Sequence, residues 1–377
     1  MASSRTVLDV NWYARPESRA WRCAQPPKAP EAFHRSLPGY HQTPLVELAG
    51  LGDELGVGHV LVKDESSRLE LPAFKMLGAS WAVYRAICAL DPTTKVRAQL
   101  DDLLTLTSRL GPITLTTATD GNHGRAVARM AHMIGAKARI FVPGVVDPLA
   151  ILLIEEEGAE VIVLDATYDE TVRRAAESAA NDPLAILVQD TSWPGYEEIP
   201  QWIVDGYSTM FGEVDAQLLG RDMNPVALTV VPTGVGSLAQ AAVAFHRSGT
   251  GVPSSLLVVE PDSAACVRLS LQQAKIVSID TGHTTMDGLN CGTPSSIAWP
   301  FLLNGIDAAI SVTDEDAATS SKDLAQLGVS SGPCGAASLA ALRAALLGPD
   351  GGSRRDQLGL DPESTVVLLN TEGDRRA

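Results

Sequence analysis

The chain has 377 residues, of which 45% are hydrophobic and 20% are charged. This composition is typical of a folded globular protein and excludes wholesale disorder, and the length predicts about two domains. The net charge of −16 arises from 29 basic and 45 acidic side chains. Because that charge repels phosphate backbones and anionic membranes, we expect no nucleic-acid partner and no membrane partner.

The cysteines are widely spaced and contain no C-x-x-C pair, which argues against both a disulfide framework and a zinc site. They are Cys23, Cys88, Cys266, Cys291 and Cys334. No apolar segment of signal-peptide length stands at the N-terminus, and no window approaches a membrane-spanning helix. We therefore predict reduced thiols, no metal and a cytoplasmic location. Cys266 and Cys291 flank the predicted site region, and whether these two pair is open.

The first regular elements expected along the chain are a strand and a long helix. His59–Lys63 is rich in β-branched residues and is predicted to be a strand, with Lys63 in a surface ion pair. The helix after Lys75 is expected to run to about Leu90, where Asp91–Pro92 stops it.

From residue 113 onward, predicted strands and helices alternate. The strands are apolar and unbroken: Ile113–Ala118, Ala138–Val142, Val161–Leu164, Ala185–Val188, Val226–Val231, Leu256–Glu260 and Ser364–Leu369. The helices include Asn122–Gly135, Tyr168–Ala180, Leu238–His246, Ala317–Leu327 and Gly335–Leu347. This alternation is typical of parallel sheets covered by helices, so the predicted fold class is α/β.

The domain boundaries are weakly marked. We place a small α/β domain at 86–194, inserted into a large discontinuous domain formed by 1–85 and 195–377. Gly348–Arg355 is expected to be a solvated Gly/Arg turn.

Lys75 lies where an apolar segment turns into a helix. Burying an ammonium group is costly, so such a lysine either extends its charge back to water, the commoner case, or has a task at that place. The task that suits it is a Schiff base with an aldehyde cofactor, which removes the charge.

Three polar loops follow predicted strands, and ligands of parallel sheets collect at the carboxyl ends of strands. In the loop 119–124 (TDGNHG), Asp120 and Asn122 are expected to point into the ligand site at the carboxyl ends of the strands. His123 has no evident partner and is interpreted as structural or solvent-facing. The loop 233–238 (TGVGSL) offers backbone N–H groups at a helix start to one phosphate. The loop 370–374 (NTEGD) offers a hydroxyl to a heterocycle nitrogen. Taken singly, each loop is equally a turn or a helix cap.

A lysine for an aldehyde, a phosphate cradle and a polar partner for a ring nitrogen are the requirements of pyridoxal 5′-phosphate. Here the sequence resembles the diaminopropionate ammonia-lyases, which are fold-type II pyridoxal-phosphate enzymes similar to threonine deaminase and the tryptophan synthase β-chain. The motifs that carry the resemblance are AFKMLGAS around Lys75, TDGNHGRAVA at 119–128, QDTSWPGYEEIP at 189–200, GLNCGTPSSIAWP at 288–300 and the ending NTEGD. The resemblance implies two open parallel-sheet domains with the cofactor cleft between them.

The resemblance also implies roles for individual residues. Lys75 would carry the cofactor in a Schiff base, Phe74 would lie against its ring and Asn122 would bond its phenolic oxygen. The phosphate would lie on Gly234, Val235, Gly236, Ser237 and Leu238. Thr371 would meet the pyridine nitrogen, and the choice of Thr371 over Asn370 is open.

The reaction of this family is α,β-elimination of ammonia from 2,3-diaminopropionate, which gives pyruvate and a second ammonia and makes the family a carbon–nitrogen lyase. By the resemblance, Lys75 would move the Cα proton from one face and Asp120 would stand as a base on the other face, which would admit the D-isomer. Asp190 would orient the distal ammonium of the substrate, or would simply cap a turn. Whether Asp120 acts as a second base is open.

Two rival functions stand beside this one. The first is another fold-type II activity, such as serine/threonine deamination or β-replacement in a biosynthetic pathway. The second is a protein that holds the cofactor or an amino acid without turnover. LELP at 69–72 and Asn290 depart from the family pattern near the substrate position, which leaves the exact substrate and its stereochemistry open. The resemblance implies a homodimer and indicates no regulator.

Overall fold

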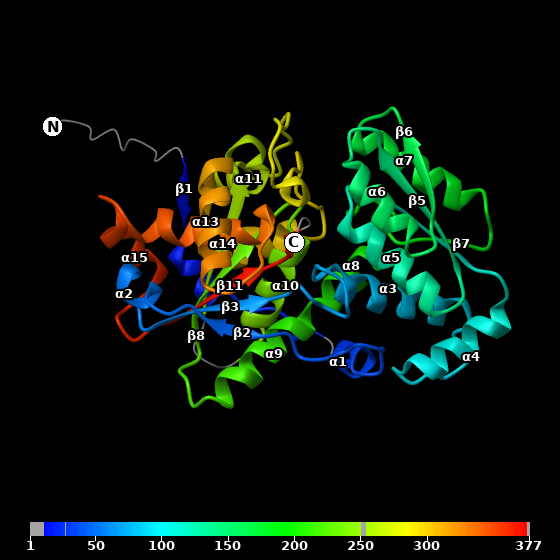
Figure 1. Cartoon of the computed structure of the whole chain (residues 1–377), viewed down its shortest axis with the longest axis horizontal. Helices are drawn as coiled ribbons and strands as arrows, with labels where there is room; N and C mark the ends of the chain where they lie inside the picture. The colour runs from blue at the N-terminus through cyan, green and yellow to red at the C-terminus, as the bar shows by residue number, and fades with distance from the viewer. Residues whose placement is uncertain (1–10, 27, 250–253, 375–377) are drawn as a thin grey trace.

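The computed structural model describes residues 11–26, 28–249 and 254–374. Its strands form two sheets that lie in separate halves of the molecule (Figure 1). The larger sheet has, in spatial order, β1 (Trp12–Ala14), β10 (Ala308–Val312), β9 (Ser255–Pro261), β8 (Val226–Pro232), β11 (Thr365–Asn370), β3 (His59–Asp64) and β2 (Leu45–Glu47). The smaller sheet has the order β6 (Glu160–Leu164), β5 (Lys137–Pro143), β4 (Thr114–Ala118) and β7 (Ala185–Leu187).

The five inner strands of the larger sheet are parallel, and the edge strands β1 and β2 pair antiparallel to their neighbours. The last strand, β11, pairs with both β3 and β8. All three strands run in one direction, so the loops after them meet at the same edge of the sheet. The last strand of the sheet in sequence therefore lies beside β3, the strand that precedes Lys75.

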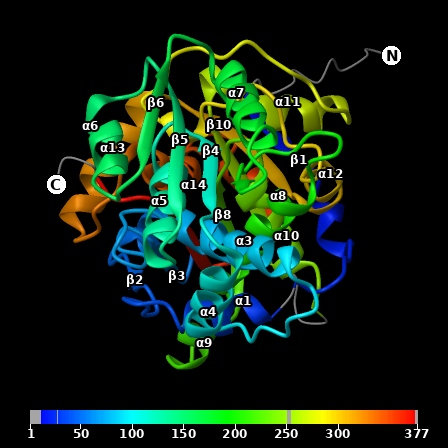
Figure 2. The ribbon, with the colours of Figure 1, turned by 90° about the vertical axis from the view of Figure 1, so that its right-hand side faces the viewer.

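The smaller sheet is parallel throughout, and Figure 2 looks onto it with β4, β5 and β6 in front. Its strands all lie between residues 114 and 187, inside the predicted small domain. The α/β fold class is confirmed, while the domain borders at 86 and 194 stay a prediction.

Helices cover both sheets. Those of the small-sheet half and its border are α3 (Lys75–Leu90), α4 (Leu100–Leu110), α5 (Asn122–Met133), α6 (Pro148–Glu155) and α7 (Tyr168–Ala180). The others are α1 (Ala29–His34), α2 (Leu51–Leu55), α8 (Glu198–Gly206), α9 (Ser208–Leu219), α10 (Ser237–His246), α11 (Cys266–Gln273), α12 (Trp299–Gly305), α13 (Asp314–Gln326), α14 (Pro333–Leu346) and α15 (Gly351–Leu358). Short 3₁₀ turns are η1 (Pro16–Ala20), η2 (Asp262–Ala264) and η3 (Asp287–Leu289). None of the helices within the described ranges is long and apolar enough to cross a bilayer.

The helix α3 joins the two halves because it packs against both α5 and α8. Its residues 76–84 are all buried. The crossing with α8 is very close, since a Cβ atom on Gly78 would lie 2.6 Å from the ring of Tyr207. A Cβ atom on Gly206 would collide with the backbone oxygen of Leu77. Glycine at both positions therefore permits this close packing, and the start of α3 is fixed relative to α8.

One predicted turn is wrong. The segment expected as a solvated Gly/Arg turn contains α15, which begins at Gly351. The helix is held by tertiary contacts: Arg355 donates hydrogen bonds to the backbone oxygens of Leu55 (2.7 Å) and Gly56 (2.9 Å), and Leu358 is buried.

The interpretation of Lys63 as a surface residue is also wrong. Its side chain is fully buried, and its Nζ donates to Glu213 Oε2 at 2.7 Å and to the backbone oxygen of Thr43 at 2.8 Å. Arg68 binds the same carboxylate through both terminal nitrogens, at 2.8 and 2.7 Å. Glu213 lies on α9, 150 positions away in sequence. The charges of Lys63 and Arg68 are therefore compensated by carboxylates inside the protein.

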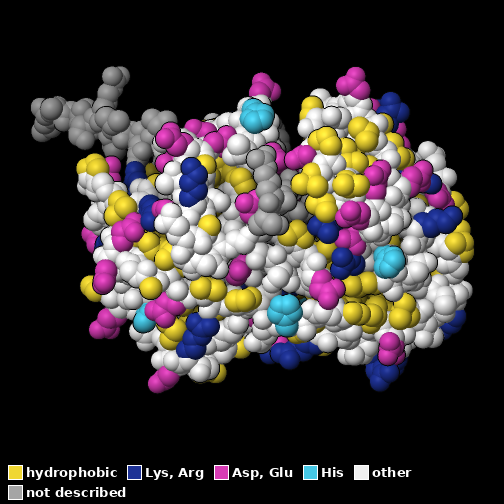
Figure 3. All heavy atoms as spheres, viewed as in Figure 1, with side chains coloured by type: hydrophobic (Ala, Val, Ile, Leu, Met, Phe, Trp, Pro, Cys, Tyr) yellow, Lys and Arg dark blue, Asp and Glu magenta, His cyan; other side chains and the backbone are white. Residues whose placement is uncertain are grey.

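The half of the molecule that holds the smaller sheet exposes apolar side chains, which gather there in Figure 3. They include Val145, Leu149, Leu152 and Val163. Exposed apolar surface that gathers in one place is typical of contacts between proteins.

The buried cluster around Glu213 predicts a large loss of stability when its carboxylate is removed. Glu213→Ala leaves the charge of Lys63 buried without its carboxylate partner and leaves Arg68 with Glu65 alone, so we expect a loss of about 3–5 kcal/mol in the free energy of unfolding. Denaturant unfolding measures this loss. Glu31→Ala, which removes an exposed partner of Arg35, is the matched control and is expected to change stability only slightly.

The pH dependence of stability tests the same cluster. Burial alone would raise the pKa of Glu213, but the hydrogen bonds from Arg68 and the charge of Lys63 lower it from 4.5 to about 2. The carboxylate therefore stabilises the protein above pH 4.5, and this contribution is lost as the pH falls toward 2. An acid titration in which Glu213→Ala loses as much stability as the parent protein over this range would contradict the assignment.

Candidate functional site

Lys75 is the first residue of α3 and lies beside the end of β11. The preceding loop is tied to the segment after β11, because Phe74 N–H donates to the backbone oxygen of Thr371 (3.2 Å) and Gly373 N–H to that of Pro72 (2.9 Å). Two loop residues, Leu69 and Glu70, have left-handed backbone conformations, with φ of 51° and 63°. The loop is thus held in one shape that places Lys75 at the strand edge.

The amine of Lys75 contacts a carboxylate in the loop after β7 of the smaller sheet. Its Nζ donates to Asp190 Oδ2 at 2.7 Å, and the two side chains are only 23% and 12% exposed. Burial alone would lower the pKa of Lys75, but the charge of Asp190 outweighs burial and raises it above the ordinary value. Burial would raise the pKa of Asp190, but Lys75 and His123 lower it. The two side chains therefore form an ammonium–carboxylate pair.

Asp190 follows β7 in a loop that is fixed by its neighbour. The amide oxygen of Gln189 accepts hydrogen bonds from Thr117 Oγ1 and from Ala118 N–H, each at 2.9 Å. The backbone oxygen of Asp190 accepts from Ser237 Oγ at 3.1 Å. The carboxylate is consequently placed by contacts with β4 of the smaller sheet and with the first residue of α10.

His123 is neither solvent-facing nor without a partner. It is buried, its Nε2 lies 2.7 Å from the backbone oxygen of Val188, and its Nδ1 lies 4.0 Å from Asp190 Oδ2. Burial lowers the pKa of His123, which favours the neutral ring with its proton on Nε2 toward the carbonyl. Local sequence patterns do not reveal this contact, because Val188 is 65 positions away from His123.

The turn before α5 brings Asp120 and Asn122 to the cavity. Thr119 Oγ1 accepts from the N–H groups of Gly121 and Gly124, both at 3.0 Å. Gly121 has φ of 149°, a conformation that side chains disfavour. The amide nitrogen of Asn122 donates to Glu372 Oε2 at 2.7 Å.

The loop after β8 has the form of an anion cradle. Gly236 has φ of 101° and directly precedes α10, whose first N–H groups have no carbonyl within the helix to bond. A Cβ atom on Gly234 would lie 2.9 Å from Cys291 Sγ and 3.1 Å from the backbone oxygen of Gly288. Only glycine leaves room between this loop and the 288–291 segment.

The segment after β11 leaves one hydroxyl for a ligand. Asn370 is committed elsewhere: its amide nitrogen donates to Asp64 Oδ1 and its amide oxygen accepts from Ser331 Oγ, at 2.8 and 2.7 Å. Thr371 Oγ1 is buried and has no hydrogen-bond partner among the described residues. A buried hydroxyl without a partner is costly, so Thr371 fits a ring nitrogen better than Asn370 does.

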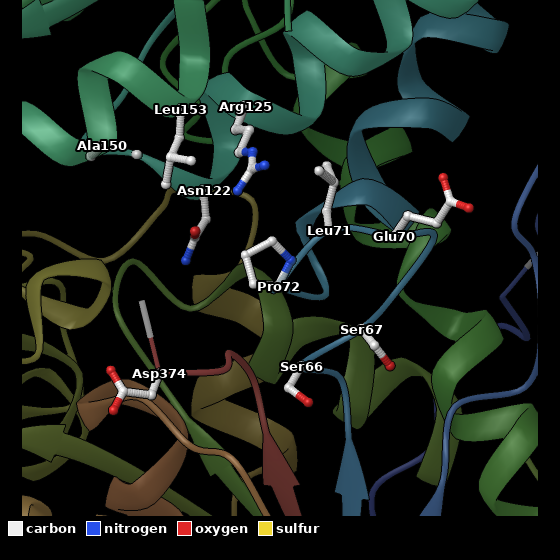
Figure 4. Close-up of a pocket in the computed structure, with 11 residues that line it drawn as sticks. Ser66, Ser67, Glu70, Leu71, Pro72, Asn122, Arg125, Ala150, Leu153 and Asp374 are labelled. Carbon is white, nitrogen blue, oxygen red and sulfur yellow. The ribbon is translucent and has the colours of Figure 1, made fainter. Parts of the chain in front are cut away.

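The loops after β4, β7, β8 and β11 meet at one cavity of about 780 Å³. Every predicted site residue lies on its wall: Phe74, Lys75, Asp120, Asn122, Asp190, Gly234, Val235, Gly236, Ser237, Leu238 and Thr371. A smaller cavity of about 360 Å³ shares Gly121 and Asn122 with it, and Figure 4 shows Asn122 and Arg125 projecting from α5 toward Pro72 there.

The cavity is acidic. Asp169, Asp280 and Glu372 line it together with the two predicted aspartates, against the single amine of Lys75. Such a wall suits a ligand with a positive charge. The aspartates 169 and 280 and Glu372 were not predicted, because their place on the wall depends on how distant loops converge.

Cys266 and Cys291 do not pair, because both are free thiols. Burial raises the pKa of Cys291 to about 12, and that of Cys266 is raised further in the same direction, also by burial. Neither thiol is therefore poised to react as a thiolate. The described residues contain no cluster of His, Cys, Asp and Glu side chains that could hold a metal ion.

The residues fit pyridoxal phosphate. A cradle that glycine alone permits lies in the same cavity as a lysine amine, and a buried hydroxyl there lacks a partner. These are the positions that the phosphate, the aldehyde and the ring nitrogen of that cofactor need.

Comparisons with known proteins agree with this geometry. The model of the family "Pyridoxal-phosphate dependent enzyme" matches residues 37–372. The diaminopropionate ammonia-lyase of Escherichia coli (strain K12) is 35% identical over 358 residues, which cover 92% of this chain and 88% of the relative. That of Salmonella typhimurium is 33% identical over 363 residues, 91% and 88% of the two chains.

Solved structures show the same likeness. The Escherichia coli diaminopropionate ammonia-lyase in complex with an aminoacrylate-PLP azomethine reaction intermediate has a TM-score of 0.81 and 32% identity, covering 96% of this chain and 91% of that one. Threonine deaminase isoform 2 from Solanum lycopersicum has a TM-score of 0.68 at 20% identity, over 94% and 92% of the chains, which shows a shared fold.

The pair of Lys75 and Asp190 makes a testable prediction for the cofactor-free protein. In Asp190→Asn the counter-charge is gone and burial dominates, so the pKa of Lys75 is expected to fall by more than about one unit. The measurement is the pH dependence of Lys75 modification by an amine-reactive reagent, followed by peptide mass spectrometry. Its midpoint should move to lower pH.

Asp169→Asn is the control for this experiment, because Asp169 lines the same cavity but is exposed. We expect its midpoint to stay close to that of the parent protein. An unchanged or higher midpoint in Asp190→Asn would show that the carboxylate does not govern the amine.

Proposed function

The chain belongs to the pyridoxal-phosphate dependent enzymes and, among them, to the diaminopropionate ammonia-lyases, and from this premise we propose that it eliminates ammonia from 2,3-diaminopropionate. The family and the fold-type II architecture predicted from the motifs are thereby confirmed. The protein is a lyase that uses pyridoxal phosphate. The reaction consumes one water and yields pyruvate and two ammonia molecules, the second of them from hydrolysis of the enamine.

The observation that carries the proposal is the meeting of Lys75 Nζ and Asp190 at 2.7 Å inside the acidic cavity that also contains the glycine cradle. When bound, pyridoxal phosphate supplies the carbonyl that condenses with amines and the ring that accepts electrons as Cα loses its proton. Lys75 would hold it covalently, with Phe74 against the ring. The N–H groups of 234–238 would bind the phosphate.

Two polar side chains would orient the cofactor ring. Thr371 would meet the pyridine nitrogen, and Asn122 would bond the phenolic oxygen. A neutral hydroxyl at the nitrogen leaves that atom unprotonated, which makes the ring a weaker electron acceptor. This suits an elimination, because the leaving group at Cβ takes up the electrons.

Lys75 and Asp120 would transfer protons, and Asp190 would orient the substrate. Lys75, in its neutral form, would take the Cα proton from one face and would return a proton to the departing ammonia. Asp120 would serve as the base on the opposite face, where the D-isomer presents its proton. Asp190, which contacts an ammonium group already, would orient the distal ammonium of the substrate.

A homodimer and a cytoplasmic location are further parts of the proposal. The exposed apolar side chains on the smaller half, among them Val145 and Val163, support an association of two copies. Light scattering after size-exclusion chromatography tests the dimer, and fractionation of the source cells tests the location.

The covalent attachment is tested by reducing the purified, cofactor-loaded protein with borohydride. We expect the visible absorbance of the cofactor to be lost and the cofactor to be fixed on the peptide that contains Lys75. Lys75→Ala should show no fixed cofactor. A protein that takes up no pyridoxal phosphate would end the proposal.

The reaction is tested by assaying pyruvate and ammonia from D- and L-diaminopropionate, L-serine, L-threonine and D-serine. The last belongs in the panel because a solved Escherichia coli relative is in complex with D-serine. We expect the highest kcat/KM with diaminopropionate. A preference for serine or threonine would instead assign a hydroxy-amino-acid deaminase.

The role of Asp120 predicts a difference between isomers. Asp120→Asn should lower kcat/KM for D-diaminopropionate by about 10²–10⁴-fold, the range of a positioned general base, while the L-isomer is affected much less. The L-isomer is thus the internal control. Equal losses with both isomers would indicate that Asp120 only shapes the cavity.

A further inference from the structure

Glu372 is a buried carboxylate that the proposed mechanism does not use. The residue is 5% exposed and lies on the cavity wall next to Thr371. Its two oxygens accept hydrogen bonds from different directions: Oε2 from Asn122 Nδ2 at 2.7 Å, and Oε1 from Cys334 N–H at 3.3 Å. A buried carboxylate with a hydrogen bond to each of its oxygens restricts the orientation of the groups that donate to it.

The two donors belong to different halves of the molecule. Asn122 begins α5, which packs on the smaller sheet, whereas Cys334 lies in the first turn of α14, which packs on the larger sheet. One carboxylate therefore connects the two halves across the cavity. The positive end of the α14 dipole favours the negative charge at this place.

Glu372 is itself firmly placed. Its backbone oxygen accepts from Gly332 N–H at 3.0 Å, and its backbone forms an isolated β-bridge with Ala73, two residues before Lys75. A Cβ atom on Gly332 would lie 2.8 Å from Glu372 Oε1, so the carboxylate is packed closely against the chain. Asn122 thus binds a fixed acceptor.

This contact decides how the amide of Asn122 is oriented. A primary amide has an acceptor oxygen and two N–H donors, and an ionised carboxylate only accepts. The nitrogen of Asn122 must therefore face Glu372, and the flipped amide, which would place two oxygens together, is excluded. One N–H is used in this charge-assisted bond, and the second remains for a ligand in the cavity.

We propose that Glu372 is a positioning residue for the cofactor, which acts by fixing the N–H of Asn122 at the phenolic oxygen of pyridoxal phosphate. The inference rests on the proposed function, because that oxygen belongs to the cofactor. An N–H donor at this place stabilises the ionised phenolic oxygen relative to the protonated one. Removing Glu372 leaves Asn122 in the cavity but frees its amide to rotate.

The test uses Glu372→Gln in the full-length protein loaded with pyridoxal phosphate. Glutamine has the same shape but one acceptor oxygen, so it cannot accept from both Asn122 and Cys334. The readout is the ratio of the absorbance bands of the cofactor with ionised and with protonated phenolic oxygen. We expect this ratio to fall about five- to tenfold, the effect of one hydrogen bond.

The affinity of the cofactor-free protein for pyridoxal phosphate is a second readout that needs no turnover, and we expect it to fall about tenfold. Glu372→Asp keeps the charge but withdraws the carboxylate from Asn122, and it should reproduce the loss if Glu372→Gln does not fold. Glu157→Gln is the matched control. Glu157 is a similarly buried carboxylate that contacts Arg125 and Arg129 of α5, outside the cavity.

A double-mutant cycle separates positioning from general structural support. If Glu372 acts through Asn122, then Glu372→Gln should change the band ratio by less than about twofold when Asn122→Ala is already present. A band ratio and affinity unchanged in both Glu372 variants, or an equal loss in the Asn122→Ala background, would overturn the inference. A parent protein that binds no pyridoxal phosphate would overturn the proposed function as well.

Discussion

The hydrogen-bonded ion pair between Lys75 and Asp190 is the contact on which the site depends. It joins the first residue of α3, the helix that packs against both halves, to the loop after β7 of the smaller sheet. Because both side chains are largely shielded from water, their attraction is weakly screened and their protonation is coupled. The protonation of the amine is consequently set by how α3 is placed relative to the loop after β7.

One topological rule explains why distant residues meet here. The strands β4, β7, β8 and β11 all present their carboxyl ends to the same cavity, and the polar loops follow these ends. Asp120, Asp190, the 234–238 loop and Thr371 arrive in this way from two sheets. The lysine arrives by a different route, on a loop that is bonded to the segment after β11. The directions of the strands therefore determine which loops form the cavity, and the side chains of these loops determine its chemistry.

The sequence predicted the parts of this site that local patterns encode. Apolar runs mark the central strands, and the polar loops 119–124, 233–238 and 370–374 that follow them contribute to the cavity wall. It failed where a distant partner decides the outcome. Lys63 is buried because Glu213, 150 positions later, neutralises it, and the helix after Gly348 exists because Arg355 reaches the carbonyls of another helix. Likewise, the choice between Asn370 and Thr371 requires knowing that the amide of Asn370 is already bonded.

The crossing of α3 and α8 has a consequence for how the sequence can vary. At Gly78 the obstacles are side chains, which a second substitution at Tyr207 or Ile203 can shrink. At Gly206 the obstacle is the peptide oxygen of Leu77, which no substitution can make smaller. A randomised library selected for turnover would therefore tolerate compensated exchanges at the first glycine but none at the second, so the two glycines differ in evolvability.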